Sequence, residues 1–263
     1  MRIIAGELRH RPLASPGDAD TTRPYPDRVK ESLFQLLRGH CEGAAVLDAF
    51  SGVGSIGLEC VSRGALRVVM VEQDKRVAEF LRRNVEALGV GDRCDVVVGD
   101  ALGAGALARC PRPLHLAFFD PPYALMEDAV GFARVMGQVS RAIALLDDTG
   151  FVVLRVPWPL THVVGEVKPT SSRPRRFKPK ASERERWKRE MRRGAPARAV
   201  EETVDLTPEE IEAAMRGEAI EAHAAASPKP PRVTPDLTLP NASGPEVHEY
   251  RGMAVLLYMK KKG

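Results

Sequence analysis

The sequence has 263 residues, of which 44% are hydrophobic and 28% are charged, so it can form a sizeable core as one large domain or two small ones. It contains no run of 18 apolar residues and begins with too short an apolar run for a secretory signal, so we expect neither a membrane span nor export, but a cytoplasmic protein. The net charge of +4 is only a mild indication of an anionic partner.

Two local elements are predicted at the start of the chain. Residues 2–16 alternate basic and apolar side chains between breaks at Gly6 and Pro12, which predicts a short β-hairpin with a basic face. Between residues 26 and 38 the apolar side chains recur at i, i+4, i+7 and i+8. This spacing predicts an amphipathic helix with Pro26 in its first turn.

Strands then alternate with helices along the middle of the chain. Apolar runs predict strands at residues 46–50, 68–72, 94–98, 114–119 and 151–156. Helical patterns lie at residues 56–62, 74–88 and 129–146, and Gly89 follows the second of them as its expected C-cap. Such an alternation is typical of the α/β class, in which helices cover both faces of a mostly parallel sheet.

The composition changes beyond residue 159. Residues 163–245 are poor in apolar side chains and rich in Lys, Arg, Glu, Pro and Ala, which predicts a largely disordered insertion with helices at residues 183–193 and 211–226. The apolar run at residues 253–258 predicts a last strand that returns to the main sheet. We therefore expect one discontinuous domain, made of residues 1–162 and 246–263 and interrupted by the insertion.

A glycine-rich loop, Asp48-Ala-Phe-Ser-Gly-Val-Gly, follows the first predicted strand of the sheet. Gly52 and Gly54 allow a tight turn and a close approach of the backbone to a ligand, which also suits a nicotinamide dinucleotide. Asp48, however, would repel a pyrophosphate and attract a cation. The loop therefore favours S-adenosylmethionine, which carries an ammonium and a sulfonium group and no phosphate.

Two more carboxylates follow the next two predicted strands. Glu72 suits the ribose hydroxyls of either cofactor, and Asp100 is placed to accept a hydrogen bond from an adenine amino group. Because open α/β sheets bind ligands at the C-terminal ends of their strands, both side chains are predicted to belong to the same site as Asp48.

The sequence Asp120-Pro121-Pro122-Tyr123 after the fourth strand is the most specific motif of the chain. Its two prolines remove two N–H donors, so the turn presents the Asp120 carboxylate and the Pro121 carbonyl as acceptors. Two acceptors can hold both protons of an aromatic amino group and turn the nitrogen lone pair towards a methyl donor. Tyr123 offers a ring on which an unstacked base can lie. The motif predicts methylation of a base amino group.

Several motifs together resemble one family. They are Arg2-Ile-Ile-x-Gly6 with Arg9 and Arg11, Thr22-Arg-Pro-x-x-Asp-Arg-Val-Lys-Glu-x-Leu-Phe34, the glycine loop with Gly57-Leu-Glu59, Arg63-Gly-Ala65, Glu72-x-Asp74, Asn84 and the tetrapeptide. On these residues the chain resembles the bacterial ribosomal RNA small-subunit methyltransferase D group. The resemblance extends over residues 1 to about 160 and the last strand, the size of one domain.

The resemblance implies a class I methyltransferase fold with an antiparallel last strand, and transfer of a methyl group from S-adenosylmethionine to guanine N2 in small-subunit ribosomal RNA. The cofactor residues are then Asp48, Phe50, Gly52, Gly54, Glu72 and Asp100, and the catalytic residues that hold the guanine are Asp120, Pro121, Pro122 and Tyr123. RNA contacts are expected at Arg2, Arg9, Arg11, Arg23 and Arg28. We expect a monomer that acts on ribosomal RNA or the small-subunit particle. No metal is expected, since the four cysteines form no Cys-x-x-Cys pair.

Three features depart from the family pattern. Tyr25-Pro26 replaces a Thr followed by Ser or Thr, Leu154-Arg155 stands where an acidic or His-containing strand end is usual, and the long insertion is extra. Basic residues concentrate between residues 168 and 198, which predicts either added nonspecific RNA affinity or a solvated loop without a specific role.

Two other functions remain open from the sequence. A DNA adenine-N6 methyltransferase would share the tetrapeptide, although no large target-recognition domain is visible. A noncatalytic RNA-binding factor in ribosome assembly could keep the fold, although an intact Asp120–Tyr123 motif argues against it. A nicotinamide dehydrogenase would leave that motif unexplained.

Overall fold

The computed structural model describes residues 1–16, 26–163 and 232–261. The helices are α1 (Asp27–Leu36), α2 (Gly57–Ser62), α3 (Lys75–Leu88), α4 (Ala104–Ala108), α5 (Tyr123–Glu127) and α6 (Ala129–Leu145). The strands are β1 (Ala45–Asp48), β2 (Arg67–Glu72), β3 (Cys94–Val98), β4 (Leu114–Phe119), β5 (Leu146–Pro157), β6 (His162–Val163), β7 (Arg232–Val233), β8 (Ala242–Tyr250) and β9 (Met253–Lys260).

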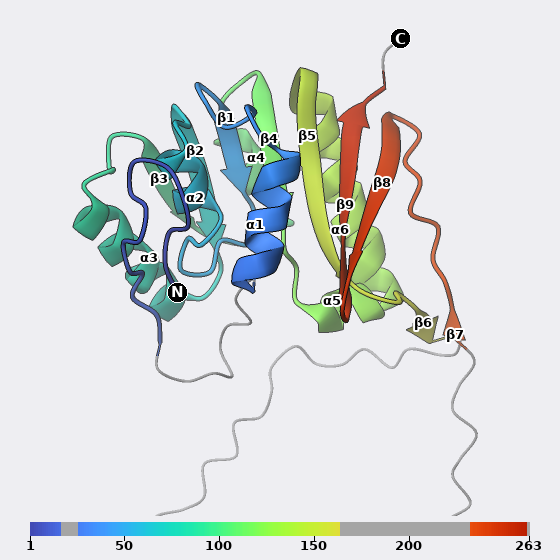
Figure 1. The fold of residues 1–263 in the computed structure, drawn as a ribbon. Coiled ribbons are helices and arrows are strands. Elements are labelled where there is room, and N and C mark those ends of the chain that lie inside the picture. The colour runs from blue at the N-terminus through green and yellow to red at the C-terminus, as the bar shows by residue number, and fades with distance from the viewer. Residues whose placement is uncertain (17–25, 164–231, 262–263) are drawn as a thin grey trace, which may run out of the picture. The chain divides into compact units, whose positions relative to one another are not determined.

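Seven strands form one sheet in the order β3-β2-β1-β4-β5-β9-β8, and β6 pairs separately with β7. Strands β1 to β5 pair in parallel, whereas β9 runs antiparallel between β5 and β8. The predicted mostly parallel sheet with an antiparallel last strand is therefore confirmed. In Figure 1 the C-terminal ends of β1, β2 and β4 lie at the lower edge of the sheet, where α5 also lies.

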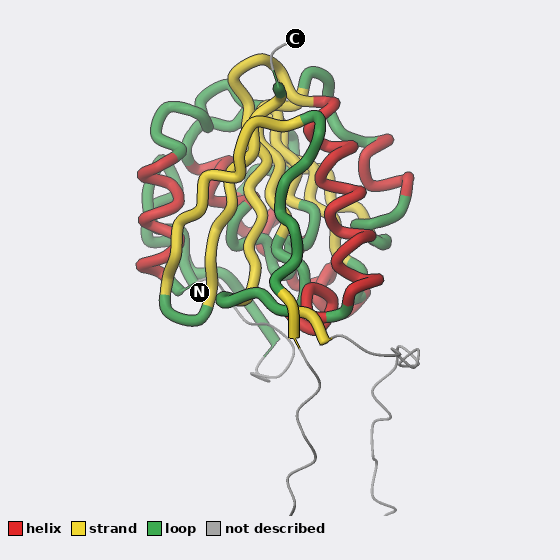
Figure 2. Tube along the Cα trace, turned by 90° about the vertical axis from the view of Figure 1, so that its right-hand side faces the viewer, coloured by secondary structure: helices red, strands yellow, loops and turns green. Residues whose placement is uncertain are grey.

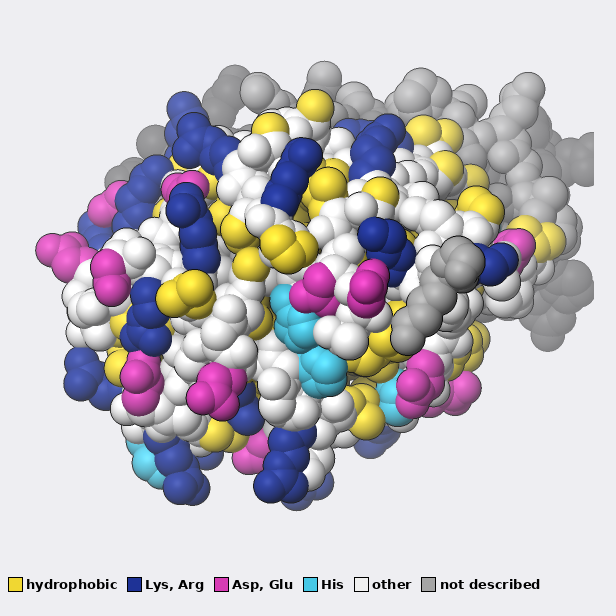
Figure 3. Space-filling view, turned by 90° about the horizontal axis from the view of Figure 1, so that it is seen from above, with side chains coloured by type: hydrophobic (Ala, Val, Ile, Leu, Met, Phe, Trp, Pro, Cys, Tyr) yellow, Lys and Arg dark blue, Asp and Glu magenta, His cyan; other side chains and the backbone are white. Residues whose placement is uncertain are grey.

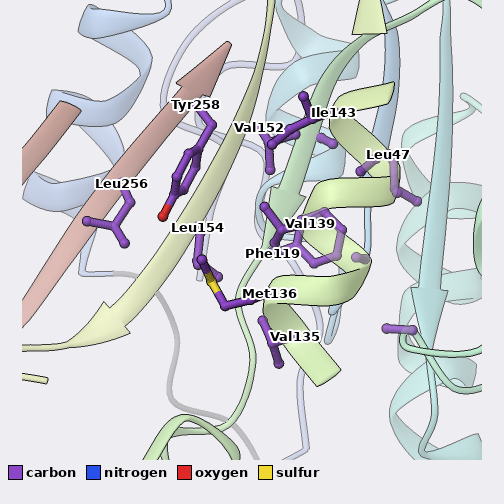
Figure 4. Close-up of a cluster of buried hydrophobic side chains, with 14 of the residues drawn as sticks. Leu47, Phe119, Val135, Met136, Val139, Ile143, Val152, Leu154, Leu256 and Tyr258 are labelled. Atoms are coloured by element: carbon purple, nitrogen blue, oxygen red, sulfur yellow. The ribbon is translucent and has the colours of Figure 1, made fainter. Parts of the chain in front are cut away.

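Helices cover both faces of the sheet because successive strand residues point to opposite sides. Val46 packs in a cluster with residues of α1, α2 and α3, whereas its neighbour Leu47 packs in a second cluster with α4 and α6. Figures 1 and 2 show the twisted sheet between these two helical layers. On the α6 side, Val135, Val139 and Ile143 recur at i, i+4 and i+8 and are fully buried (Figure 4). Helices therefore cover both faces of the sheet, which leaves the ends of the strands open to a ligand.

Helix α3 has the ends that the sequence predicts. The Asp74 side chain accepts hydrogen bonds from the backbone N–H groups of Arg76 and Val77, as an N-cap does. Gly89 follows the helix with φ 68°, in the left-handed conformation that a glycine adopts without strain. These two caps fix where the helix begins and ends, so the predicted C-cap is confirmed.

The N-terminal segment, residues 1–16, forms a short, irregular version of the predicted β-hairpin. An antiparallel bridge joins Arg2 and Pro12, and the N–H groups of Ile3 and Leu13 donate to the carbonyls of Arg11 and Met1 at 3.0 Å each. Between the two arms, the N–H groups of Ile4 and Ala5 donate to the side chain of Glu59 in α2. The hairpin pairing is therefore confirmed but short, and a side chain of α2 satisfies part of the backbone between its arms.

The predicted insertion, residues 163–245, is too long at its C-terminal end. Strand β8 begins at Ala242 and forms an edge of the main sheet next to β9. An edge strand buries only part of its side chains, so its polar composition resembled that of the insertion. Strand β6 pairs with β7, which brings the two ends of the insertion together. The helices expected at residues 183–193 and 211–226 lie outside the described residues.

Within residues 1–16, 26–163 and 232–261, no helix is long and apolar enough to cross a membrane. The four cysteines are free, and all but Cys94 are buried. In the same ranges, no group of three or more His, Cys, Asp or Glu side chains is placed to hold a metal ion.

Candidate active site

Three carboxylates lie at the edge where the parallel strands end. Asp48 is the last residue of β1, Glu72 is the last residue of β2, and Asp120 directly follows β4. Because β1 pairs with both β2 and β4, the three side chains come from adjacent strands. The charges of Asp120 and Glu72 both raise the pKa of Asp48, so the three groups are close enough to interact. This edge of the sheet is a concentration of negative charge.

The glycine loop between β1 and α2 is tied to two of these carboxylates. The Gly52 N–H donates to Glu72 Oε2 at 2.9 Å, and the Gly57 N–H donates to Asp48 Oδ2 at 2.9 Å. Gly54 has φ +92°, and a Cβ atom there would lie 2.5 Å from a methyl group of Leu81. A side chain at Gly54 would be both strained and crowded, so the path of the loop requires glycine.

Asp48 is buried, with an exposed fraction of 2%. Burial raises the pKa of Asp48 to about 7, the hydrogen bond from Gly57 lowers it, and the neighbouring carboxylates Asp120 and Glu72 raise it further. Burial also raises the pKa of Glu72, against the hydrogen bonds from the N–H groups of Asp74 and Gly52. A cation bound at this edge would stabilise the ionised carboxylates and would therefore bind more tightly as they deprotonate.

Asp100 follows β3, one strand beyond Glu72, and its side chain is 47% exposed. Its Oδ1 atom accepts the N–H of Leu102, and its Oδ2 atom lies 3.3 Å from Arg134 of α6. Buried Gln138, also on α6, donates to the carbonyl of Ala101 at 2.9 Å and holds the same loop. Asp100 is thus accessible on a loop of fixed path. The apolar pattern of α6 gave no signal for the role of Gln138.

The tetrapeptide leaves β4 and starts α5. Pro122 is the N-cap of α5, its carbonyl accepts the N–H of Leu125 at 2.9 Å, and Tyr123 is the first helical residue. On the preceding strand, the Phe119 ring contacts the Phe50 ring of the glycine loop, with 6.4 Å between ring centroids. The turn is therefore fixed between a buried strand and a helix, next to the loop that begins after β1.

Asp120 forms an ion pair with Arg155 of β5. The Arg155 Nε atom donates to Asp120 Oδ1 at 2.5 Å, and the guanidinium carbon lies 5.7 Å from the centroid of the Tyr123 ring. Burial raises the pKa of Asp120 to about 7, although the charge and the hydrogen bond of Arg155 lower it. The sequence marks Arg155 only as a departure from the family pattern, because its partner is 35 residues away in the chain.

The N-terminal segment is clamped against the elements that carry the site. The Lys30 Nζ atom lies 3.3 Å from Glu59 Oε2, and both side chains are buried (1% and 0% exposed). Buried Asn84 of α3 donates to the carbonyl of Val53 in the glycine loop at 2.9 Å and to the carbonyl of Ala14 at 3.0 Å. These contacts hold α1, α2, α3 and the N-terminal segment around the glycine loop. Such pairs lie too far apart in sequence to be read from local patterns.

The arginines expected to contact RNA are mostly at the surface. Those that the structure describes are exposed: Arg2, Arg9, Arg11 and Arg28. Arg2 lies 3.5 Å from Asp27, and Arg11 donates to the carbonyl of Ala87 at the end of α3. Arg23 lies outside the described residues. Neither contact removes a side chain from solvent, so these arginines remain candidates for contacts with an anion.

A second polar cluster lies at the opposite end of β4. His40 Nδ1 is 3.0 Å from His115 Nε2, and His115 Nδ1 is 2.7 Å from Asp147 Oδ2. His115 is near the first residue of β4, whereas Asp120 follows the last one. Figure 3 shows the end of the molecule away from the tetrapeptide, where basic and acidic side chains are interspersed. This cluster is therefore separate from the candidate site.

Comparison with solved structures gives the same fold. The chain is similar to the Escherichia coli protein yhhF, a provisional methyltransferase, with a TM-score of 0.57 and 22% identity over 99% of this chain and 98% of that one. A provisional methylase from Haemophilus influenzae matches with a TM-score of 0.51 and 21% identity, covering 99% of this chain and 98% of that one. These identities are low, so the two matches support the fold alone.

Comparison with curated proteins supports the resemblance seen in the motifs. The chain is 36% identical over 152 residues to ribosomal RNA small subunit methyltransferase D of Escherichia coli strain K12, which covers 58% of this chain and 69% of that protein. It is 29% identical over 154 residues to YlbH of Bacillus subtilis, a provisional rRNA methyltransferase, covering 58% of this chain and 80% of that one. The predicted relationship to the methyltransferase D group is confirmed.

A family model matches the part of the chain that carries the site. It is described as conserved hypothetical protein 95 and matches residues 1–165, which include the glycine loop, the three edge carboxylates, the tetrapeptide and Arg155. Since this match covers more than half of the 263 residues, the chain belongs to the family described as conserved hypothetical protein 95.

Proposed function

We propose that this protein transfers a methyl group from S-adenosylmethionine to the exocyclic N2 of a guanine in small-subunit ribosomal RNA. The observation that carries the proposal is the position of the tetrapeptide, which follows β4 next to the glycine loop after β1. The named activity of the Escherichia coli relative supports the choice of RNA as the substrate. Such a substrate implies that the protein works in the cytoplasm.

The residues at the strand ends fit this cofactor. Asp48, Glu72 and Asp120 create a negative field that favours a ligand with sulfonium and ammonium groups over one with a pyrophosphate. No atom beyond its chain neighbours lies within 4 Å of a Cβ atom built on Gly52, so a ligand can approach the backbone of the loop there. Glu72 and exposed Asp100 are hydrogen-bond acceptors for the ribose and the adenine amino group. When bound, the cofactor supplies an electrophilic methyl group.

The tetrapeptide orients the amino group that is methylated. Asp120 and the carbonyl of Pro121 accept its two protons, and because Pro121 and Pro122 have no N–H groups, no backbone donor at these residues competes. The nitrogen lone pair, otherwise delocalised into the base, is then directed at the methyl group. As the nitrogen–carbon bond forms, the sulfur–methyl bond of the bound cofactor would break and its electron pair would stay on the sulfur, now a neutral thioether. The nitrogen is then cationic and releases one proton. Asp120 can accept that proton, since burial raises its pKa to about 7.

The base has to leave its stack to reach this turn. Tyr123 is half-buried at the start of α5 and offers its ring for stacking, which contributes about 1–3 kcal/mol per base. A flipped or single-stranded nucleotide is therefore the expected substrate. The exposed arginines Arg9, Arg11 and Arg28 are proposed to contact RNA phosphates, each of which adds to the salt dependence of binding.

The insertion is proposed to add nonspecific RNA affinity. Its two ends meet at β6 and β7, and His162 Nε2 of β6 donates to the carbonyl of Met126 in α5 at 2.9 Å. The insertion therefore leaves the domain next to the helix that begins with Tyr123 (Figure 1). Deletion of residues 168–198 should weaken RNA binding and reduce the slope of affinity against salt concentration. Unchanged affinity and slope would exclude this role.

A labelled-methyl transfer assay tests the proposed function. Purified protein is incubated with S-adenosylmethionine that carries a labelled methyl group and with unmodified small-subunit ribosomal RNA, small-subunit particles or duplex DNA. Nuclease digestion and mass spectrometry then identify the labelled nucleoside. The proposal predicts N2-methylguanosine from RNA or particles. Label in N6-methyladenine of DNA would support the DNA methyltransferase instead, and cofactor binding without any transfer would support a noncatalytic assembly factor.

A further inference from the structure

The side chain of Arg155 lies on the same side of the sheet as Asp120. Leu154 pairs in register with Phe119, so Arg155 is adjacent to the residue that follows β4. Leu154 and Phe119 belong to the cluster on the α6 side, whereas Val153 and Phe118 belong to the cluster on the opposite side. Strand alternation therefore directs Arg155 and Asp120 to one side, towards each other.

The contact between the two side chains is buried. Side-chain exposure is 6% for Arg155 and 18% for Asp120, and Nε donates to Oδ1 at 2.5 Å. A hydrogen bond between a guanidinium and a carboxylate is roughly twice as strong as one between neutral groups. It engages Oδ1, so Oδ2 is the carboxylate oxygen left to accept a proton of the base amino group. The ion pair thus determines the rotation of the carboxylate that the proposed function requires.

Arg155 also reaches the second functional side chain of the tetrapeptide. Its guanidinium carbon lies 5.7 Å from the centroid of the Tyr123 ring, within the range of a cation–π interaction. One buried guanidinium therefore contacts both the acceptor for the amino group and the ring on which the base stacks. A lysine would keep the charge but not the planar guanidinium that fits both partners.

The charges around Asp120 explain why an arginine at this position matters. Arg155 of β5 forms an ion pair with Asp120, and the carboxylate of Asp48 on β1 is close enough to interact with it. Two further titratable side chains belong to the same region: Glu72 on β2, the strand next to β1, and Tyr123, the first residue of α5. Burial raises the pKa of Asp120, and Arg155 is the positive charge that lowers it. Without Arg155, burial would raise the pKa of Asp120 further and favour the protonated carboxyl group at neutral pH. A protonated carboxyl group presents a donor where the base amino group needs an acceptor.

We propose that Arg155 is a positioning residue for methyl transfer, which favours the ionised form of the Asp120 carboxylate, fixes its rotation and supports the Tyr123 ring on which the base stacks. The proposal rests on the function proposed above. The basic residue near the end of β5 would then be part of the functional site.

Kinetics of Arg155→Gln and Arg155→Lys test this role, with Arg109→Gln as the matched control. Arg109 is an exposed arginine that is paired with Asp95 on β3 and lies outside the site. For Arg155→Gln we expect kcat to fall at least about tenfold at neutral pH and the acidic limb of the kcat profile to move up by about one pH unit or more. Cofactor affinity should change less than about threefold, and Arg155→Lys should keep the acidic limb near that of the wild type while kcat stays reduced.

A direct titration of Asp120 separates failure of this proposal from failure of the proposed function. The carboxyl carbon signal of Asp120 is followed by NMR against pH in wild type, Arg155→Lys and Arg155→Gln, assigned with Asp120→Asn. An upward shift of the Asp120 pKa in Arg155→Gln, mostly reversed in Arg155→Lys, supports the role of Arg155 even if the wild type methylates no RNA. An Asp120 pKa that is the same in all three proteins, or a kcat loss in Arg155→Gln that is fully explained by its unfolded fraction, overturns it.

Discussion

Replacement of Asp48 by asparagine should stabilise the protein without its cofactor at alkaline pH and weaken cofactor binding. In the wild type the Gly57 N–H donates to Asp48 Oδ2 at 2.9 Å. Asparagine has nearly the same size as aspartate, and its side-chain oxygen can still accept this hydrogen bond. The substitution therefore removes the charge but not the hydrogen bond that ties α2 to β1.

The magnitude follows from the pKa of Asp48, which burial raises from 3.8 to about 7. A carboxyl group whose pKa is higher in the folded than in the unfolded state contributes stability at low pH, and this contribution is lost as the pH rises through the folded pKa. At about 1.4 kcal/mol per unit, the difference of about three units gives at most about 4 kcal/mol. The side-chain amide of asparagine has N–H donors where the carboxylate had lone pairs. Leaving these buried donors without acceptors costs about 1–3 kcal/mol, which offsets part of the gain in stability.

Urea denaturation of wild type and Asp48→Asn at pH 5 and pH 8 measures this effect. At pH 8 the variant should be more stable than the wild type by about 1–3 kcal/mol, and at pH 5, where Asp48 is protonated, it should be no more stable. Calorimetry at pH 7.5 should show cofactor affinity reduced at least about tenfold, since one of three carboxylates is gone. A stability difference that is the same at both pH values, or unchanged cofactor affinity, would refute the assignment of Asp48 as a buried carboxylate that attracts a cation.

Three further substitutions probe the glycine loop, the N-terminal clamp and the stacking residue. Gly54→Ala should lower the free energy of unfolding by about 2–4 kcal/mol and abolish cofactor binding, because φ is +92° and the new Cβ would lie 2.5 Å from a leucine methyl group. Urea unfolding and calorimetry measure the two effects, and normal cofactor binding would contradict the prediction. Asn84→Ala should cost about 2–3 kcal/mol and speed hydrogen exchange at the Ala14 amide, which donates to Asn84 at 2.8 Å; unchanged exchange would show that the clamp is unimportant. Tyr123→Ala should raise the KM for RNA about tenfold or more, whereas Tyr123→Phe should stay within about threefold; equal effects would argue against stacking.

Much of the fold follows from local patterns in the sequence. The alternation of apolar runs and helical patterns predicts the parallel sheet, because strands buried on both faces need continuous apolar residues. Asp74 and Gly89 mark the ends of α3 for reasons that depend only on the residues themselves. The position of Asp120 near Asp48 also follows, since parallel strands that end in the same direction bring their following loops to one edge.

Most of the features that the sequence does not predict depend on partners far apart in the chain. Glu59 accepts N–H groups from residues that lie 54 and 55 positions away, which holds the N-terminal hairpin against α2. Arg155 forms an ion pair with Asp120 because β4 and β5 are neighbouring strands in the sheet. Strand β8 is an edge strand with mostly polar side chains, so its composition does not separate it from the insertion.

The central claim is that the turn beginning at Asp120 presents a guanine amino group to a methyl donor. It is tested most directly by mass spectrometry of nucleosides from small-subunit ribosomal RNA of a strain that lacks this protein. The claim predicts the loss of one N2-methylguanosine, its return with the wild-type gene, and no return with Asp120→Asn at matched protein levels. Unchanged methylation in the deletion strain, or full restoration by Asp120→Asn, would contradict it.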